Sequence, residues 1–281
     1  MQEPDAPIVL HRGEGEVLAG HQSWSSRIKV ARDELLLLES SSGPGERGAA
    51  PHIHREHADA FYVLEGELLF HVAGEQRSLL AGSFVLAPPE LVHGFEVGPK
   101  GARYLNLHVP GRAYASLARA RRDCIEFDAA DGDSFPPPTD GEAVDSGTSI
   151  VLHAGEGERV GTNVVKAARP ELSLIEFEVK SGGEVQPHLH RGHSDSFYIL
   201  EGELEVRTGD EVVIATTGTF VLSPPGVVHS LRHISIEPTR LLNLHTPGGF
   251  VEYWRELVAL HEQGIQPDNV FFERHDVFDP D

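Results

Sequence analysis

The sequence predicts a mainly β protein in which two similar barrel domains follow one another along the chain. A histidine-rich phrase occurs twice, as PHIHREHADAFYVLEGEL from Pro51 and PHLHRGHSDSFYILEGEL from Pro187, with 13 of 18 positions identical. The apolar runs in each copy are short and bounded by Gly or Pro, which is typical of strands in a sandwich or barrel. Only one short stretch near the end of each copy has a helical pattern.

Length and composition exclude several classes of protein. A chain of 281 residues has room for two ordinary domains, and its hydrophobic content of 40% is that of a globular protein. With 44 acidic and 23 basic side chains, the net charge of −21 predicts no nucleic-acid partner and no membrane partner. Cys124 is the single cysteine, so no disulfide can form within the chain, and without a targeting segment we expect a cytoplasmic protein.

The repeat covers nearly the whole chain and sets the expected domains. Three motif residues recur at a constant spacing of 136 positions: His52, Gly66 and His93 return as His188, Gly202 and His229. Upstream, IVLHRGEGE from Ile8 matches IVLHAGEGE from Ile150, and downstream DSFPPP is echoed by DVFDPD near the C-terminus. The segment 129–149 is rich in Pro, Gly, Asp and Ser and is typical of a linker. We expect an N-terminal barrel over 1–139 and a C-terminal barrel over 140–281.

Within the first copy, the apolar runs predict strands at 35–38, 61–64, 68–72, 83–87 and 104–109, each with a partner in the second copy. The helical patterns fall at 114–122 and 250–263, after the strands of each copy. The second places one set of side chains on a single face: Phe250, Trp254, Leu257, Val258 and His261. A short helix is therefore expected after each barrel.

The histidines predict one metal site in each copy. His52 and His54 alternate along an extended strand and so share a face, and Asp59 and His93 follow in the same copy. The second copy repeats this set as His188, His190, Asp195 and His229. Three imidazoles and one carboxylate suit a divalent Fe, Mn, Ni, Co, Cu or Zn ion, one per barrel, with positions open for water or substrate. The alternative is that these buried rings only hydrogen-bond one another.

These residues carry a resemblance to a known family. The pattern His-x-His, four residues, an acidic residue, six residues and Gly, followed by Gly, five residues, Pro-x-Gly, two residues and His, resembles the two motifs of the cupin superfamily. Copy 2 matches the second motif with Gly218, Pro224, Gly226 and His229, whereas copy 1 has Glu90 in the place of a glycine. The resemblance implies a bicupin, with two jelly-roll β-barrels in tandem.

Both copies depart from the family at the acidic ligand, which is usually Glu and here is Asp59 or Asp195. Aspartate reaches about 1.3–1.5 Å less far, a large fraction of a metal–oxygen bond of about 2.1 Å. Each Asp either ligates the metal, directly or through water, or orients a bound water and acts as a general base. We favour ligation, and we take both as the candidate catalytic residues.

Other repeated polar residues have less certain roles. His57 and His193 either orient the Asp or lie in solvent. Two pairs share one strand face and either contact the site or cap a strand end: Asn106 with His108, and Asn243 with His245. Lys29 and Lys166 also correspond between the copies, but the sequence assigns no role to them.

Among bicupins, the chain is most similar in kind to the quercetin 2,3-dioxygenase-like proteins. That resemblance implies a metal-dependent dioxygenase in which the acidic residue acts as a base toward an aromatic or enediol-type small molecule. Because one fold hosts many chemistries, two alternatives stay open. They are a non-oxidative metal-dependent isomerase, lyase or cyclase, and a non-catalytic binder of small molecules. The substrate, the metal, the number of active barrels and the choice between monomer and homo-oligomer are not determined by the sequence.

Overall fold

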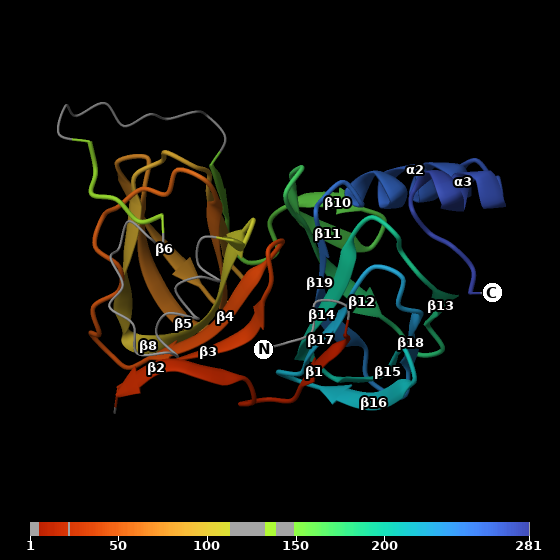
Figure 1. The fold of residues 1–281 in the computed structure, drawn as a ribbon, viewed down its shortest axis with the longest axis horizontal. Coiled ribbons are helices and arrows are strands. Elements are labelled where there is room, and N and C mark those ends of the chain that lie inside the picture. Colours follow the sequence, from red (N-terminus) through yellow and green to blue (C-terminus); the bar gives the residue numbers. More distant parts are fainter. Residues whose placement is uncertain (1–5, 22, 113–132, 139–148, 281) are drawn as a thin grey trace. The chain divides into compact units, whose positions relative to one another are not determined.

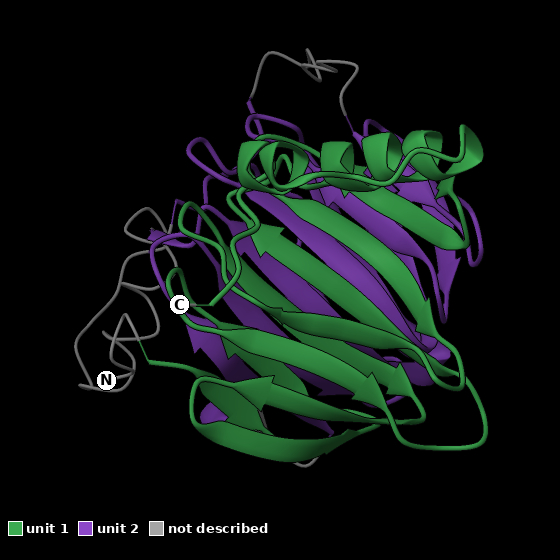
Figure 2. Cartoon of the chain, turned by 90° about the vertical axis from the view of Figure 1, so that its right-hand side faces the viewer, with its two compact units in different colours: residues 1–14, 157–281 green, residues 15–156 purple. Residues whose placement is uncertain are grey.

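The structure is a computed structural model that describes residues 6–21, 23–112, 133–138 and 149–280 (Figure 1). The described residues form nineteen strands and two short helices, so the predicted mainly β, jelly-roll fold class is confirmed. The chain divides into two compact units, which Figure 2 colours separately. We call residues 15–156 the N-terminal unit and residues 1–14 with 157–281 the C-terminal unit.

The N-terminal unit is built around two long strands, β5 (Ala58–Val72) and β8 (His93–Val109). These pair along their lengths, with register shifts that let both strands bend. The sheet order is β2-β3-β4-β8-β5-β7-β9, with β6 on β5. The other strands are β2 (Glu16–His21), β3 (Trp24–Ala31), β4 (Leu36–Ser42), β6 (Glu75–Leu80), β7 (Phe84–Ala87) and β9 (Ile150–Leu152). The predicted runs 61–64 and 68–72 are thus two halves of one strand.

The C-terminal unit contains two sheets that enclose an apolar core of Val, Leu, Ile and Phe side chains. The first sheet has the order β1-β17-β14-β19-β12-β11-β10 and the second β13-β18-β15-β16. Their strands are β1 (Ile8–Leu10), β10 (Glu158–Val160), β11 (Asn163–Ala168), β12 (Ser173–Val179), β13 (Glu184–His188), β14 (Ser194–Glu201), β15 (Glu203–Thr208), β16 (Glu211–Thr216), β17 (Phe220–Ser223), β18 (His229–His233) and β19 (Thr239–Thr246).

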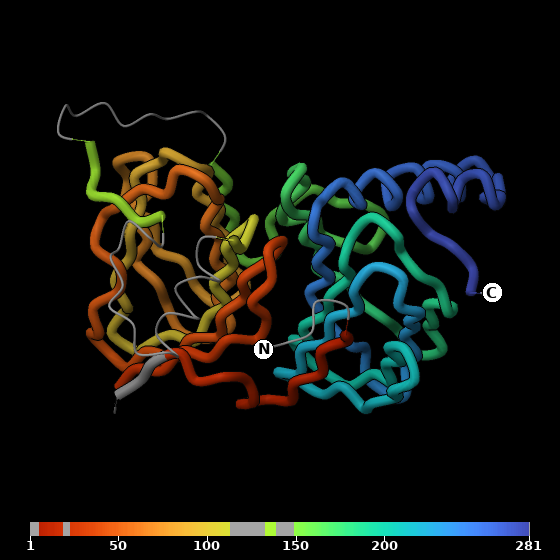
Figure 3. The backbone as a smooth tube through the Cα atoms, in the orientation of Figure 1, coloured from red at the N-terminus to blue at the C-terminus, as the bar shows by residue number. Residues whose placement is uncertain are grey.

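Two helices follow the last strand of the C-terminal unit, α2 (Val251–Glu262) and α3 (Asn269–Arg274). The predicted helix at 250–263 is therefore confirmed, and Trp254 and Val258 pack against a small cluster that includes Ile175. After α3 the chain returns to the unit, where Phe278 pairs with Leu189 (Figure 3). The helix predicted at 114–122 lies outside the described residues. No helix in the described part of the chain is long and apolar enough to cross a membrane.

Each repeat places its first short strand in the unit formed mainly by the other repeat. β1 pairs with β17 of the C-terminal unit, with Ile8 opposite Leu222. β9 pairs with β7 of the N-terminal unit, with Leu152 opposite Phe84. The compact units therefore differ from the division at residues 139 and 140 that the repeat predicts. The physical reason is that each three-residue apolar strand extends the edge of a sheet that is distant in sequence.

The glycine that follows the acidic residue in each motif, Gly66 or Gly202, lies where a neighbouring segment comes too close for a side chain. Gly66 has a φ of 76°, and a Cβ there would lie 2.0 Å from the carbonyl oxygen of Gly101. Gly202 in the second repeat has a φ of 86° and a less crowded site, where a Cβ would lie 2.7 Å from Thr239 Oγ1 and 3.0 Å from Thr239 Cα. Only glycine combines this conformation with such contacts, which let β5 and β14 continue into the strand segments that follow.

The repeated lysines form buried ion pairs that stabilise the outer strands. Lys29 Nζ lies 2.9 Å from Glu39 Oε2, and Lys166 Nζ lies 3.1 Å from Glu176 Oε1. Both lysine side chains are fully buried. Burial would raise the pKa of Glu39, but the charges and hydrogen bonds of Lys29 and Arg103 outweigh it and lower that pKa. The sequence shows that these two lysines correspond between the copies, and the structure adds that each forms a buried ion pair.

Candidate metal centres

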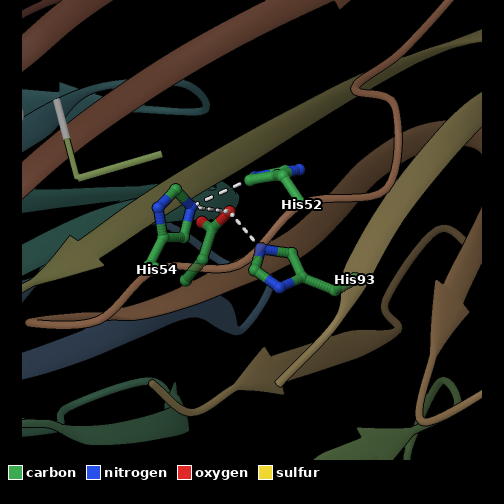
Figure 4. Close-up of side chains that lie close together, drawn as sticks. His52, His54 and His93 are labelled. Atoms are coloured by element: carbon green, nitrogen blue, oxygen red, sulfur yellow. Dashed lines mark hydrogen bonds and ion pairs between the residues drawn. The ribbon is translucent and has the colours of Figure 1, made fainter. Parts of the chain in front are cut away.

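The structure brings together the four predicted residues of the N-terminal unit. His52 and His54 lie in the segment before β5, Asp59 lies near the start of β5, and His93 begins β8. The Nε2 atoms of His52 and His54 are 3.2 Å apart. Figure 4 shows how His52, His54 and His93 lie close together. Asp59 Oδ2 lies 3.5 Å from His54 Nε2 and 3.3 Å from His93 Nε2. The donor atoms of all four residues fall within 4.8 Å of one another.

The C-terminal unit repeats this arrangement with its own four residues. Asp195 Oδ2 lies 3.2 Å from His229 Nε2 and 3.8 Å from His190 Nε2. The ring centroid of His188 lies 4.3 Å from that of His229. The donor atoms of these four residues also fall within 4.8 Å of one another. All eight residues singled out from the sequence therefore lie in two clusters, one in each unit.

Every histidine of the two clusters is oriented by a backbone carbonyl. A carbonyl oxygen only accepts, so Nδ1 of each ring donates its hydrogen and Nε2 keeps its lone pair for the centre of the cluster. In the N-terminal unit the acceptors are Ala50 for His52 at 2.8 Å, Asp133 for His54 at 2.8 Å and Leu91 for His93 at 2.8 Å. In the C-terminal unit they are Gln186 for His188 at 2.8 Å, Asp276 for His190 at 2.6 Å and Val227 for His229 at 3.0 Å.

The electrostatics favour the protonation states that metal binding needs at most of these residues. His54 is the exception: burial lowers its pKa, but the hydrogen bond and charge of Asp59 outweigh burial and raise it. Burial, reinforced by neighbouring imidazoles, lowers the pKa of His52 and of His188 to about 4, so both rings are neutral at neutral pH. Burial opposes ionisation of Asp59 and Asp195, but the surrounding histidines outweigh it and hold the pKa of each carboxyl well below its ordinary range. Neutral imidazoles beside an ionised carboxylate are the forms that bind a divalent cation.

The spacing of the donor atoms tests whether these residues fit a metal ion. A bond length of about 2.1 Å separates neighbouring ligand atoms by about 3.0 Å in octahedral and about 3.4 Å in tetrahedral geometry. The distance from Asp195 Oδ2 to His229 Nε2, 3.2 Å, and that from Asp59 Oδ2 to His93 Nε2, 3.3 Å, fall in this range, whereas the 3.8 Å from Asp195 Oδ2 to His190 Nε2 is longer. The Nε2 atoms of His190 and His229 are also buried without a hydrogen bond in the described structure. The residues fit an ion, and the shorter side chain of aspartate reaches the cluster.

The aspartates are held by two residues on the facing strands. Asn106 on β8 donates from Nδ2 to Asp59 Oδ1, and Asn243 on β19 donates to Asp195 Oδ1 at 2.6 Å. His108 is buried beside Asp59, with Nδ1 3.6 Å from Oδ1. Each Oδ1 is thereby occupied, and each Oδ2 is left to face the three rings. Of the two alternatives left open for these asparagines and histidines, contact with the site is correct and capping of a strand end is wrong.

Asp133 and Asp276 complete the sites and were missed as functional residues in the sequence. Asp276 accepts hydrogen bonds from the backbone N–H groups of Arg191 and Gly192 and lies 3.0 Å from His193 Nδ1. Asp133 makes the same contacts in the N-terminal unit, including one of 2.9 Å to His57 Nδ1. Their φ angles of 58° and 61° place both in the left-handed region that aspartate tolerates. The sequence signal that could have identified them is the match between the DSF segment of the first copy and the DVF segment of the second.

The segments that contain Asp133 and Asp276, which we call the tail segments, also hold His57 and His193 in place. His57 and His193 are 1% and 8% exposed, so the alternative that they lie in solvent is wrong. The guanidinium of Arg191 lies 3.9 Å above the ring of Phe278, and that of Arg55 lies 4.0 Å above Phe135. Each tail therefore closes over its His-x-His segment by a cation–π contact and by hydrogen bonds.

A cavity of about 670 Å³ adjoins the site of the C-terminal unit. His188, Asp195, Asn243 and His245 line one end of it. Seven aromatic side chains line the rest, from the strands, from the α2 region, from α3 and from the tail: Phe177, Phe197, Phe250, Tyr253, Trp254, Phe272 and Phe278. The ring of Phe250 stacks on that of His245, with centroids 4.0 Å apart. The cavity offers a planar, apolar molecule a place beside the metal-binding residues.

Comparison with protein families gives two matches within the chain. The Cupin domain family matches residues 39–108 and again residues 175–245. Quercetin 2,3-dioxygenase from Bacillus subtilis (strain 168) is 26% identical over 303 residues, covering 93% of this chain and 88% of the relative.

Solved structures share the fold at low sequence identity. AerE from Microcystis aeruginosa superposes with a TM-score of 0.58 at 14% identity, covering 85% of this chain and 98% of the other. Oxalate decarboxylase from Lactobacillus farciminis, solved as a formate complex, superposes with a TM-score of 0.56 at 13% identity, covering 97% and 96%. At such identities the likeness concerns the fold alone.

Proposed function

The chain belongs to the Cupin domain family as a tandem pair, and on that basis we propose that it is a dioxygenase of quercetinase type. It acts on an aromatic or enediol-type small molecule at a site of three histidines and one aspartate. The observation that carries this proposal is the aromatic cavity of about 670 Å³ that ends at His188 and Asp195. Quercetin 2,3-dioxygenase from Bacillus subtilis supports the choice, because its similarity covers both units.

The residues that would hold a metal are His52, His54, Asp59 and His93 in one unit and His188, His190, Asp195 and His229 in the other. When bound, a divalent transition metal supplies Lewis acidity and redox chemistry to the oxygens of the substrate. Fe, Mn, Ni, Co, Cu and Zn all accept nitrogen and carboxylate donors, so the donor set does not select one of them. The Nδ1 bonds to backbone carbonyls keep the rings oriented before the ion arrives.

The chain itself binds, orients and deprotonates the substrate. The aromatic walls hold a planar ring system, and they exclude water from the reacting atoms. Asp195 lines the cavity and presents Oδ2 toward the histidines, so it receives the proton of a substrate hydroxyl that binds there. Asn243 holds the other oxygen of that carboxylate at 2.6 Å and fixes its direction during the transfer.

The same cavity disfavours a small dianionic substrate such as oxalate. Its charged lining consists of four carboxylates and one cation, Arg191; the carboxylates are Glu184, Asp195, Glu273 and Asp279. A small dianion would leave most of the apolar wall uncovered and would face more negative than positive side chains. A large planar molecule with few charges covers this lining better.

Metal content and oxygen uptake test the proposal together. We expect two equivalents of a transition metal per chain by elemental mass spectrometry, and oxygen consumption when quercetin is added. Asp195→Asn keeps the shape of the side chain and is expected to lower kcat by about 100-fold or more. Turnover of the substrate without oxygen uptake would assign a non-oxidative reaction, and folded protein without metal would overturn the enzyme proposal. The cytoplasmic location and the absence of macromolecular partners stay predictions.

A further inference from the structure

The two units differ in the size of the side chains beneath their metal clusters. The repeat spacing and strand register align three large aromatic residues of the N-terminal unit with three aliphatic residues of the C-terminal unit. The first set is Phe70, Phe95 and Tyr104, and the second is Val206, Leu231 and Leu241. All six side chains are buried, with exposures between 0% and 9%. The histidine clusters above them are nearly the same.

In the N-terminal unit these rings pack into one another next to the cluster. Phe61 contacts Phe70 and Phe95 with ring centroids 5.0 and 5.2 Å apart, and Phe95 contacts Tyr104 at 5.5 Å. The ring of Phe70 is parallel to that of His93, with centroids 6.4 Å apart. We call Phe61, Phe70, Phe95 and Tyr104 the aromatic plug. Edge-to-face contacts of this kind are favourable and hold the rings in place.

The hydroxyl of Tyr104 has partners that exist only in the first repeat. Ser40 and Ser42 of β4 hydrogen-bond to it, which opposes the rise in its pKa caused by burial. The aligned positions in the second repeat are Phe177 and Val179, which offer no hydrogen bond to a hydroxyl. The plug is therefore supported by matched polar residues, as expected for a built feature of the N-terminal unit.

In the C-terminal unit the positions of two plug residues lie in the wall of the cavity. Leu231 and Phe197, the partners of Phe95 and Phe61, line the cavity that reaches His188 and Asp195. Phe177, which aligns with Ser40 of the first repeat, also lines the cavity. Of the three aliphatic partners, Leu231 lines the cavity, at the position where the aromatic plug of the other unit has the larger ring of Phe95.

We infer that the C-terminal unit alone binds the aromatic ligand, and that the plug reserves the N-terminal cluster for a metal without substrate. This inference deepens the proposed function and rests on it for the class of ligand, a planar aromatic molecule with adjacent oxygens. Leu231 is the specificity-determining position, because it lies in the cavity wall and is the aligned partner of Phe95.

The test measures binding rather than turnover, using the full chain loaded with metal in both sites. Isothermal titration with quercetin under nitrogen is expected to give one ligand per chain for the natural protein. Leu231→Phe is expected to weaken that binding by tenfold or more while two metals per chain remain. Val212→Phe is the matched control, because Val212 is 56% exposed on β16 and its replacement leaves the cavity unchanged.

A second variant keeps the inference open to refutation if Leu231→Phe is unstable. Phe95→Leu alters only the plug, so it is expected to leave the affinity of the C-terminal unit within twofold of the natural value. Two ligands per natural chain would overturn the inference and leave the proposed function intact. No binding by protein that holds both metals would overturn the ligand class, and with it both proposals.

Discussion

Replacing Asp276 by Ala removes the carboxylate that closes the C-terminal tail over the metal-binding segment. This side chain accepts the N–H groups of Arg191 and Gly192 at 2.9 and 2.7 Å, and it contacts His193 at 3.0 Å. Its backbone carbonyl accepts the Nδ1 hydrogen of His190 at 2.6 Å. Although Ala keeps that carbonyl, it loses the bonds that hold the carbonyl in position.

The magnitude follows from the number and exposure of these contacts. A hydrogen bond to a buried charged group contributes about 1.5–3 kcal/mol, but the side chain of Asp276 is 27% exposed, which reduces each to about 1 kcal/mol. Two backbone bonds, together with about 1 kcal/mol for Ala at a φ of 61°, give a loss in stability of about 3 kcal/mol. Because the carbonyl orients His190, the metal affinity of this site is expected to fall about 10–100-fold.

Competition titration with a chelating dye measures the affinity of each site, and urea denaturation measures stability. Asp276→Asn is the control, because Asn tolerates the same φ and keeps one acceptor, so its effect should be smaller. Asp133→Ala is the twin in the N-terminal unit, where the carboxylate is only 6% exposed and the loss should be larger. Natural metal affinity at the C-terminal site of folded Asp276→Ala protein would refute the reasoning.

Three further predictions concern stability. Lys166→Met removes the closest cation of Glu176 and should lower the free energy of unfolding in urea by about 3–5 kcal/mol. The double variant with Glu176→Met should recover most of this lost stability. A double variant that is as unstable as the single variant would argue against the ion pair. The lowered pKa values of about 4 for His52 and His188 mean that the unfolded chain binds more protons between pH 4 and 6.5. Metal-free protein should therefore keep the stability linked to these two rings above pH 6.5 and lose that contribution as the pH falls toward 4. Thermal melts measure it, and no fall in melting temperature between pH 6.5 and 4 would contradict the shifts. Glu90→Gly should stabilise the N-terminal unit by about 1 kcal/mol, because Glu90 has a φ of 67°; a lower melting temperature would show that its side chain matters more than its backbone.

The local part of each site could be predicted from sequence because it depends on strand alternation. His52 and His54 lie on one face two residues apart, and Asp59 follows at the start of the next strand. The matching set in the second copy repeats the same local geometry. The position of His93 came from the spacing of the repeat, and the structure pairs its backbone with that of His52.

The contacts between distant segments could not be predicted in this way. The hydrogen bond from His54 to Asp133 spans 79 residues, and that from His190 to Asp276 spans 86. The exchange of β1 and β9 joins segments that the repeat alone assigns to the opposite barrels. No periodicity within one element records such pairings, because they are set by which sheet edge is open once the other strands have folded.

The sequence by itself determined a duplicated, mainly β chain with two sets of three histidines and one aspartate. Those features follow from residue identity, from spacing and from the alternation of side chains along a strand. Only the tertiary structure decided that Asp133 and Asp276 close the sites, that aromatic rings pack together in the described part of one unit, and that a cavity adjoins the cluster of the other. The physical reason is that packing depends on side-chain volumes from several strands at once, which similar local motifs leave free to differ.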